Sequence, residues 1–209
     1  DGVSTLEGAL IEPLAVGFHA AKQGGAQAGQ TAVVFGAGCI GLVSMMALKA
    51  CGVSRVYVVD IMEKRLEKAL ELGADGVING KEVDVLEKTK ELTGGEGFDL
   101  AIETAGTEIT TNQAIQVVRK GSTIVLVGYG KTGMMNMMMG LALDKELTFK
   151  TVFRYRHIYP MAIEAVEQGK VNLKGIATHI FDFDDIQTAM DRSVNEKAEI
   201  VKAVVKIAK

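Results

Sequence analysis

The sequence has few of the residues that brace secreted or membrane-spanning proteins. Its 209 residues include two cysteines, two prolines and no tryptophan. Two cysteines cannot build the disulfide framework of a small secreted domain, which favours a reducing compartment and predicts a cytoplasmic location. No apolar run approaches the roughly 20 residues of a membrane span, and the first residues lack the basic and apolar regions of a signal peptide. We therefore expect no membrane association.

An excess of positive charge is also missing. The formal net charge is −3, from 23 basic and 26 acidic side chains, and no basic run carries interleaved aromatic residues. A surface that binds nucleic acid or an anionic membrane needs the opposite balance, so neither partner is expected. The hydrophobic share of 48% is ordinary for a globular protein. The length favours one large domain, or one domain with a smaller piece.

The most informative segment is the glycine turn Gly36-Ala37-Gly38-Cys39-Ile40-Gly41. It follows the apolar run 31–35 and opens a helical pattern that ends near Cys51, and a second apolar run, 56–59, ends in Asp60. This order of strand, glycine turn, helix, strand and acid is typical of dinucleotide-binding domains. Glycine lets the backbone approach a pyrophosphate, and the helix start offers that anion free N–H groups. The alternative is a tight turn without a ligand.

Asp60 favours NAD over NADP. A carboxylate at this position can accept hydrogen bonds from a ribose diol, and it would repel a 2′-phosphate. Two like charges about 4 Å apart cost roughly 1 kcal/mol in water and about 4 kcal/mol at an effective dielectric of 20. Lys64 and Arg65 follow closely in the sequence, so a phosphate-binding role for these two side chains stays open.

Strand and helix patterns alternate from Thr31 to about Tyr155. The strand candidates, dense in valine, isoleucine and phenylalanine, are residues 31–35, 55–60, 76–79, 98–104, 122–127 and 147–155. The later helix candidates are residues 63–72, 84–92 and 107–119. This alternation predicts an α/β fold with a doubly wound parallel sheet of the Rossmann type, whose ligand lies beyond the carboxyl ends of the strands. Besides the glycine turn and Asp60, those ends carry Thr104-Ala105-Gly106, Gly128-Tyr129-Gly130 and Phe153-Arg154-Tyr155.

The pattern changes after His157. A helix is expected at 160–168, a strand at 179–183, a helix at 184–194 and a strand at 200–207. These few elements are too little for a domain that folds alone, so they indicate part of another domain. Five methionines crowd the segment 133–140; we interpret them as core filler, with a subunit contact as the alternative.

A complete catalytic centre is not evident in the sequence. A nicotinamide-dependent enzyme needs a base or a metal to take the proton of the alcohol. His19, His157 and His179 have no partners at metal-ligand spacing, and there is no CxxC or HExxH motif. We interpret the three histidines as surface or packing residues. The residues alone thus indicate a cofactor site without a catalytic centre.

Several segments together resemble a known family. The segments that carry the resemblance are the run Glu7–Ala20 (with Ile11-Glu12-Pro13-Leu14 inside it), the glycine turn, Asp60, Val125–Gly128 and Val152–Tyr155. The resemblance is to the sorbitol (polyol) dehydrogenase branch of the zinc-dependent medium-chain dehydrogenases. The resemblance covers essentially the whole chain. It implies a zinc-dependent enzyme that transfers hydride between a polyol, such as sorbitol, xylitol or iditol, and NAD. A 2,3-butanediol or other secondary-alcohol dehydrogenase, or a nucleotide-binding module without turnover, are the alternatives.

The resemblance also assigns roles to residues. Glu12 corresponds to the glutamate that coordinates zinc or holds its water, Arg154 to an arginine that pairs with this glutamate, and Tyr155 to a substrate-side tyrosine. The family's other zinc ligands, a cysteine and a His-Glu pair, match nothing in this chain, which predicts that the chain alone is inactive. The residues expected on the cofactor are Gly36, Gly38, Cys39, Ile40, Gly41, Asp60, Arg65, Thr104, Ala105, Gly106, Val127, Gly128, Tyr129, Phe153 and Arg154.

The resemblance further implies a domain division and an assembly. Residues 1–20 would connect to an N-terminal catalytic domain that precedes the chain, residues 21–157 would form the NAD-binding domain, and residues 158–209 would be the C-terminal part of the catalytic domain. The absence of an initiator methionine at Asp1 fits a piece of a longer protein. Homodimers or homotetramers are expected, joined through the sheet edge near 147–153.

Overall fold

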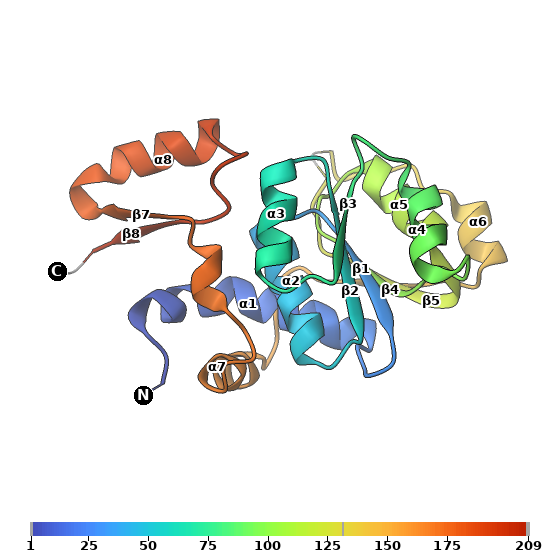
Figure 1. The fold of residues 1–209 in the computed structure, drawn as a ribbon, viewed down its shortest axis with the longest axis horizontal. Coiled ribbons are helices and arrows are strands. Elements are labelled where there is room, and N and C mark those ends of the chain that lie inside the picture. Colours follow the sequence, from blue (N-terminus) through green and yellow to red (C-terminus); the bar gives the residue numbers. More distant parts are fainter. Residues whose placement is uncertain (1, 131, 208–209) are drawn as a thin grey trace.

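The computed structural model describes residues 2–130 and 132–207, and its main feature is a six-stranded parallel sheet (Figure 1). In chain order the strands are β1 (Thr31–Phe35), β2 (Arg55–Asp60), β3 (Gly76–Asn79), β4 (Phe98–Glu103), β5 (Val118–Leu126) and β6 (Thr148–Thr151). They lie side by side in the order β3-β2-β1-β4-β5-β6, and all five pairings are parallel. This is the strand order of dinucleotide-binding sheets, and the predicted doubly wound fold is confirmed.

Helices cover both faces of this sheet. In chain order they are α1 (Thr5–Gly24), α2 (Cys39–Ala50), α3 (Glu63–Glu71), α4 (Val85–Thr93), α5 (Glu108–Val117) and α6 (Met139–Asp144). Alternate residues of β1 point to opposite faces. Val34 therefore joins the core beneath α1, α2 and α3, whereas Val33 joins the core on the side of α4, α5 and α6. Burial on both faces explains why the strands are nearly continuous apolar runs.

Helix α1 begins with a capping box. The Glu7 carboxylate accepts the Ser4 backbone N–H at 2.9 Å, and the Ser4 hydroxyl accepts the Glu7 N–H at 3.4 Å. Further along, α1 crosses α2 very closely. A Cβ atom at Gly17 would lie 2.6 Å from the Val43 carbonyl oxygen, so only glycine fits at this crossing. The buried residues of the helix begin at Leu10 and continue to Gly24, whereas its first turn is exposed or half-buried.

Two strands differ from the sequence prediction. β6 ends at Thr151 rather than at residue 155, because its partner β5 ends at Leu126; the last backbone bond runs from Val152 N–H to the Leu126 carbonyl at 2.9 Å. β5 in turn begins at Val118 and not at residue 122, since Val118 already pairs with Phe98 across a register shift. The predicted helix over 107–119 consequently stops at Val117.

The segment after His157 lies partly apart from the main sheet. It contains α7 (Tyr159–Glu167), β7 (His179–Asp182), α8 (Ile186–Asn195) and β8 (Ala203–Lys206). Helix α7 packs against α1, whereas β7 and β8 form a separate two-stranded parallel sheet beside α8 (Figure 1). The helices and strands expected here from the sequence are present with small shifts of their ends.

The methionine segment 133–140 does not fill the core as predicted. Met134, Met138 and Met139 are exposed, the first of them at 85%, and Met137 alone among the five is grouped with the core under α4 and α5. The reason is the path of the backbone across the outside of α5. Asn112 holds it there by accepting the Met138 N–H at 2.8 Å and donating to the Asn136 carbonyl at 3.0 Å. The side chains of Met134, Met138 and Met139 consequently point outward.

Within residues 2–130 and 132–207 we find no helix with the length and apolar character that crossing a membrane requires.

Candidate cofactor-binding site

The glycine turn between β1 and α2 lies at the carboxyl edge of the sheet. Gly36 has φ of 96°, and a Cβ there would lie 2.8 Å from the Thr104 hydroxyl. A Cβ at Gly41 would lie 1.7 Å from the Gly36 carbonyl oxygen. Protein packing therefore explains glycine at positions 36 and 41. Gly38 is different, because its nearest neighbour would be Arg65 Nη1 at 3.8 Å; the space above it is free for a ligand.

The start of α2 offers unsatisfied N–H groups beside this space. Helices α1, α4 and α5 begin with the capping side chains Ser4, Asp84 and Thr107. In α2 the capping position is Gly38, and no side chain caps it among the described residues. First-turn N–H groups, here those of residues 39–41, have no carbonyl partner within a helix. Together with the positive end of the helix dipole they form an anion-binding site.

Asp60 is held against the glycine turn. The parallel register of β1 and β2 places Phe35 beside Val59, so the residues that follow the two strands are neighbours. One carboxylate oxygen of Asp60 accepts the Ala37 N–H at 2.6 Å, and the other accepts the Ile61 and Met62 N–H groups at 2.7 and 3.0 Å. Since each carboxylate oxygen has two acceptor sites, the oxygen on Ala37 can still accept a bond from a ligand hydroxyl.

The two basic residues after Asp60 are engaged elsewhere. Arg65 donates from Nε and Nη2 to the Lys197 carbonyl at 3.1 and 2.6 Å, and Lys64 pairs with Glu199. Both contacts tie α3 to the segment that precedes β8. A 2′-phosphate beside Asp60 would thus meet a carboxylate and two cations already engaged with other groups.

The loop after β4 is tied to the same turn. The Thr104 hydroxyl donates to the Phe35 carbonyl at 2.8 Å, which links the ends of β4 and β1. Glu103, the last residue of β4, is fully buried, and the sequence reasoning missed it. Its Oε1 accepts the Ala105 and Gly106 N–H groups, both at 2.9 Å. Burial raises the pKa of Glu103, and these hydrogen bonds oppose that effect. The available signal was a carboxylate inside an apolar strand pattern.

The loop after β5 touches the loop after β4. A Cβ at Gly128 would lie 2.1 Å from the Gly106 backbone nitrogen, so this contact requires glycine. Beyond it, Tyr129 is 85% exposed and Phe153 is 80% exposed. Two large, mostly exposed aromatic side chains at neighbouring strand ends thus give this edge an apolar wall.

The residues assigned to the substrate side are partly brought together. Tyr159 donates to the Tyr155 hydroxyl at 3.0 Å, and the two rings lie 5.0 Å apart. This bond, followed by burial and then by the charges of Tyr155 and Glu12, raises the pKa of Tyr159 to about 12. Glu12 is therefore near the tyrosine pair. Arg154 instead lies over the Phe153 ring at 5.4 Å, and the expected pairing of Arg154 with Glu12 is not made within the described residues.

The chain does not assemble a metal centre from its own side chains. Among the residues that the structure describes, no group of three or more His, Cys, Asp or Glu side chains could hold a metal ion. Burial raises the pKa of the Cys39 thiol, which favours the neutral form over the thiolate that binds metals. His19 is buried in α1 and packs there, as one of the two interpretations predicted. The residues present would thus contribute Glu12 at most to a zinc site.

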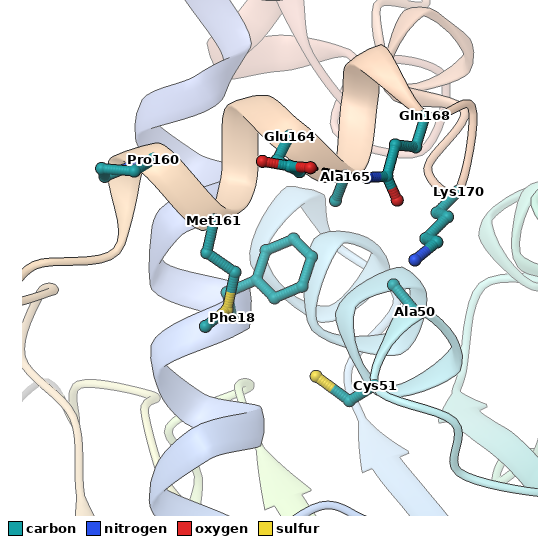
Figure 2. A pocket seen from close by; sticks show the side chains of 9 residues that line it. All are labelled: Phe18, Ala50, Cys51, Pro160, Met161, Glu164, Ala165, Gln168 and Lys170. Carbon is teal, nitrogen blue, oxygen red and sulfur yellow. Dashed lines mark hydrogen bonds between the residues drawn. The ribbon is translucent and has the colours of Figure 1, made fainter.

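A cavity of about 380 Å³ lies between α1, α2 and α7, away from this edge (Figure 2). It opens beside Phe18, Cys51 and Met161, with Glu164 and Lys170 on its rim. Cys51 follows the last residue of α2, whereas the glycine turn spans the start of this helix. The cavity is therefore separate from the candidate cofactor site.

This chain is similar to known dehydrogenases and dehydrogenase-like proteins. A family model described as zinc-binding dehydrogenase matches residues 39–168. An uncharacterized zinc-type alcohol dehydrogenase-like protein of Escherichia coli is 42% identical over 208 residues, which cover all of this chain and 59% of that protein. The sorbitol dehydrogenase of Bacillus subtilis is 36% identical over 205 residues, which cover 98% of this chain and 58% of the enzyme.

Solved structures agree with this grouping. The 2R,3R-butanediol dehydrogenase of Bacillus subtilis has a TM-score of 0.92 at 31% identity, over all of this chain and 59% of the enzyme. A short chain alcohol dehydrogenase of Escherichia coli, solved with the cofactor NADH, has a TM-score of 0.92 at 26% identity, over 99% of this chain and 61% of that one. The chain thus spans about three fifths of the length of these proteins. The resemblance deduced from the motifs is confirmed, and the chain belongs to the zinc-binding dehydrogenase family.

Proposed function

We propose that this chain is the NAD-binding part of a zinc-dependent alcohol dehydrogenase that transfers hydride between NAD and a polyol such as sorbitol, xylitol or iditol. The observation that supports NAD most directly is the free space above Gly38, between the uncapped start of α2 and the Asp60 carboxylate. An anion fits the helix start and a ribose diol fits the carboxylate. A relative with NADH bound shares this fold.

Each group at the sheet edge has a task in this proposal. When bound, NAD takes up the hydride that leaves the alcohol carbon. The N–H groups of Cys39, Ile40 and Gly41 would hold the pyrophosphate, and Asp60 would accept bonds from the adenosine ribose, with Arg65 beside it. The loops at Thr104–Gly106 and Val127–Tyr129 would flank the other half of the cofactor. Tyr129, Phe153 and Arg154 would exclude water from it.

Glu12, Arg154 and Tyr155 would face the substrate. The metal would require further ligands from outside this chain, so we derive no catalytic step from it. Residues 1–20 and 158–209 would belong with the catalytic domain, and residues 21–157 with the NAD-binding domain. Exposed apolar side chains on the β7–β8 unit support this division, since between 45 and 80% of each is exposed; they are Ile180, Phe183, Ile186, Met190 and Ile207.

The assembly would be a homodimer or homotetramer in the cytoplasm. β6 is an edge strand, and on its outer side no strand of the described residues pairs with it. An unpaired edge is a template for pairing with another strand. A second copy of β6 would supply one by symmetry.

Two alternatives have support of their own. A secondary alcohol such as 2,3-butanediol is favoured by the similarity to the butanediol dehydrogenase. A nucleotide-binding module without turnover is favoured because the described residues contain no group of three or more side chains that could hold a metal ion.

Calorimetric titration of NADH into the chain, followed by an assay with NAD, zinc and sorbitol or 2,3-butanediol, separates these possibilities. We expect NADH to bind, with no turnover by this chain and turnover of sorbitol by the protein that carries the remaining zinc ligands. A folded chain that does not bind NADH contradicts the proposal. Turnover by the chain alone would show that its metal centre is complete, and preference for butanediol would reassign the substrate.

A further inference from the structure

Glu103 stands apart from the other carboxylates of the chain. Of the aspartates and glutamates in residues 2–130 and 132–207, it alone is buried, with no exposed surface. A buried carboxylate is costly unless its oxygens are hydrogen-bonded. Its surroundings therefore indicate what the charge does, and they all belong to the carboxyl edge of the sheet.

The side chain of Glu103 organises the loop that follows β4. Besides the N–H groups of Ala105 and Gly106, its Oε1 accepts the Thr110 hydroxyl at 2.8 Å, and Gly106 N–H also lies 3.2 Å from Oε2. All of these neighbours donate, and an ionised carboxylate only accepts. The carboxylate thus acts as an internal anion for the N–H groups that precede α5 and for the Thr110 hydroxyl in its first turn.

The backbone of Glu103 organises the loop that follows β5. Its carbonyl accepts the Val127 and Gly128 N–H groups at 2.8 and 3.0 Å. The side chain reaches the same loop, because a Cβ at Gly128 would lie 2.7 Å from Oε2. One residue therefore fixes two loops that are about 25 residues apart in the sequence.

We propose that Glu103 is a positioning residue for the cofactor, which sets the loops 104–107 and 127–129 against one another and so shapes the half of the site that lies over β4 and β5. This inference rests on the proposed function. In the strand order β3-β2-β1-β4-β5-β6 the adenosine half lies on the side of β2, where Asp60 is. Glu103 therefore acts on the nicotinamide half and not on the adenosine half.

The test uses Glu103→Gln, which keeps the shape of the side chain but replaces one acceptor oxygen with a donor. We expect NADH to bind about tenfold more weakly, as for the loss of a charged hydrogen bond, whereas AMP, which has only the adenosine half, binds within twofold of the parent. Hydrogen exchange of backbone amides should rise in both loops, 104–107 and 127–129. A purely structural role would weaken both ligands equally.

Two further variants serve as controls. Ser122→Ala removes another buried polar contact of the same strand pair, the bond from the Ser122 hydroxyl to the Phe98 carbonyl at 3.1 Å, but at the opposite end of β4. It should lower the melting temperature and leave NADH binding unchanged. Thr110→Val removes one hydrogen-bond donor from the Glu103 carboxylate. Like Glu103→Gln, it should weaken the binding of NADH. It also carries the test if Glu103→Gln does not fold.

The outcomes for the inference and for the proposed function differ. If the parent chain does not bind NADH, the proposed function fails, and the exchange measurement still tests Glu103. Faster exchange in both loops would then show that Glu103 holds the two loops together without a role in cofactor binding, and faster exchange confined to 104–107 would overturn the link between the loops as well. If the parent binds NADH and Glu103→Gln binds it equally well, or loses AMP to the same extent as NADH, the inference is wrong.

Discussion

Asp60 and Ala37 are joined by a hydrogen bond of 2.6 Å, donated by the Ala37 N–H to the Asp60 carboxylate. Through this bond the acid at the end of β2 reaches the middle of the glycine turn that follows β1. Asp60 therefore does two things at once: it holds the turn, and it presents a negative charge where a ribose would lie. A substitution of Asp60 tests both together.

Asp60→Ala should weaken NADH binding about tenfold or more and relax the discrimination against NADPH, because both the ribose acceptor and the repulsive charge are lost. Fluorescence titration with each nucleotide measures this. Asp75→Ala is the matched control, since Asp75 accepts the Val56 N–H at 2.7 Å and pairs with Lys49 at the other end of β2. The control should lower the stability of the fold and leave the affinities for NADH and NADPH unchanged. An unchanged NADH-to-NADPH ratio in Asp60→Ala removes the argument for NAD.

Gly41 and Gly38 should respond differently to alanine. Gly41→Ala forces a Cβ onto the Gly36 carbonyl oxygen, so both the melting temperature and NADH affinity should fall. Gly38→Ala finds open space and an ordinary φ of −75°, so the fold should keep its melting temperature while NADH loses affinity, because the new methyl group occupies the ligand space. Gly8→Ala, in helix α1 with nothing within 4 Å of the new Cβ, should leave NADH affinity unchanged and should raise the melting temperature slightly, because alanine favours the helix over glycine. A Gly38→Ala variant that binds NADH normally would show that this space is not used.

Much of the sheet could be predicted from the sequence because its strands are buried on both faces. Such strands are apolar throughout, and their ends are marked by Gly36, Asp60 and Gly106, which made the carboxyl edge recognisable. The ends of β6 were not predictable in this way. The strand stops where β5 stops, and that depends on a partner about 25 residues away and not on local propensity.

Glu103 and the exposed methionines could not be predicted for the same reason, because both depend on contacts with segments distant in the sequence. The apolar strand pattern around Glu103 indicates only that a carboxylate is buried there, and its role is visible only when the loops after β4 and β5 are both in place. The exposed methionines were mistaken for core because composition carries no information about the direction of a loop. That direction is set by Asn112 of helix α5, whose side chain forms hydrogen bonds with the backbone of Asn136 and Met138.

His19 should make stability depend on pH. Burial, and then the charges of Arg156 and Lys22, lower the pKa of His19 below its ordinary value of 6.5. A lowered pKa means that the unfolded chain binds the proton more readily. The stability from neutral His19 is therefore fully present above pH about 6.5 and is lost as the pH falls below it. Urea unfolding from pH 8 to pH 5 should show this loss.

The matched variants for this titration are His19→Gln and His157→Asn. His19→Gln removes the titrating ring from α1, so the slope of the unfolding free energy between pH 6.5 and 5 should become shallower. His157→Asn alters an exposed histidine with φ of 53°, a conformation that asparagine tolerates, and the slope should persist. A parent chain with a flat profile over this range would contradict the assignment.

Glu12→Ala should separate the substrate side from the cofactor side. Glu12 is exposed on α1, and its charge acts on Tyr159 as well as on Cys39 in the glycine turn. A carboxylate donates no hydrogen bond to a pyrophosphate, so it makes none of the cofactor contacts assigned to the backbone N–H groups of that turn. We expect NADH affinity within twofold of the parent and a large loss of turnover in the zinc-loaded, full-length enzyme. If Glu12→Ala abolishes NADH binding while the fold is preserved, Glu12 does not belong to the substrate side.

The edge strand β6 offers a direct test of the proposed assembly. Val152 donates its N–H to β5, and alternate residues of a strand bond to opposite sides, so the N–H of Thr151 points outward. Thr151→Pro removes that donor without removing a bond to β5, and Thr151→Ala keeps it as a matched control. In sedimentation velocity, Thr151→Pro should shift the chain to the monomer while Thr151→Ala stays with the parent. If both variants sediment as the parent dimer, the copies are joined through another surface, for which the exposed methionines at Met134, Met138 and Met139 are the next to substitute.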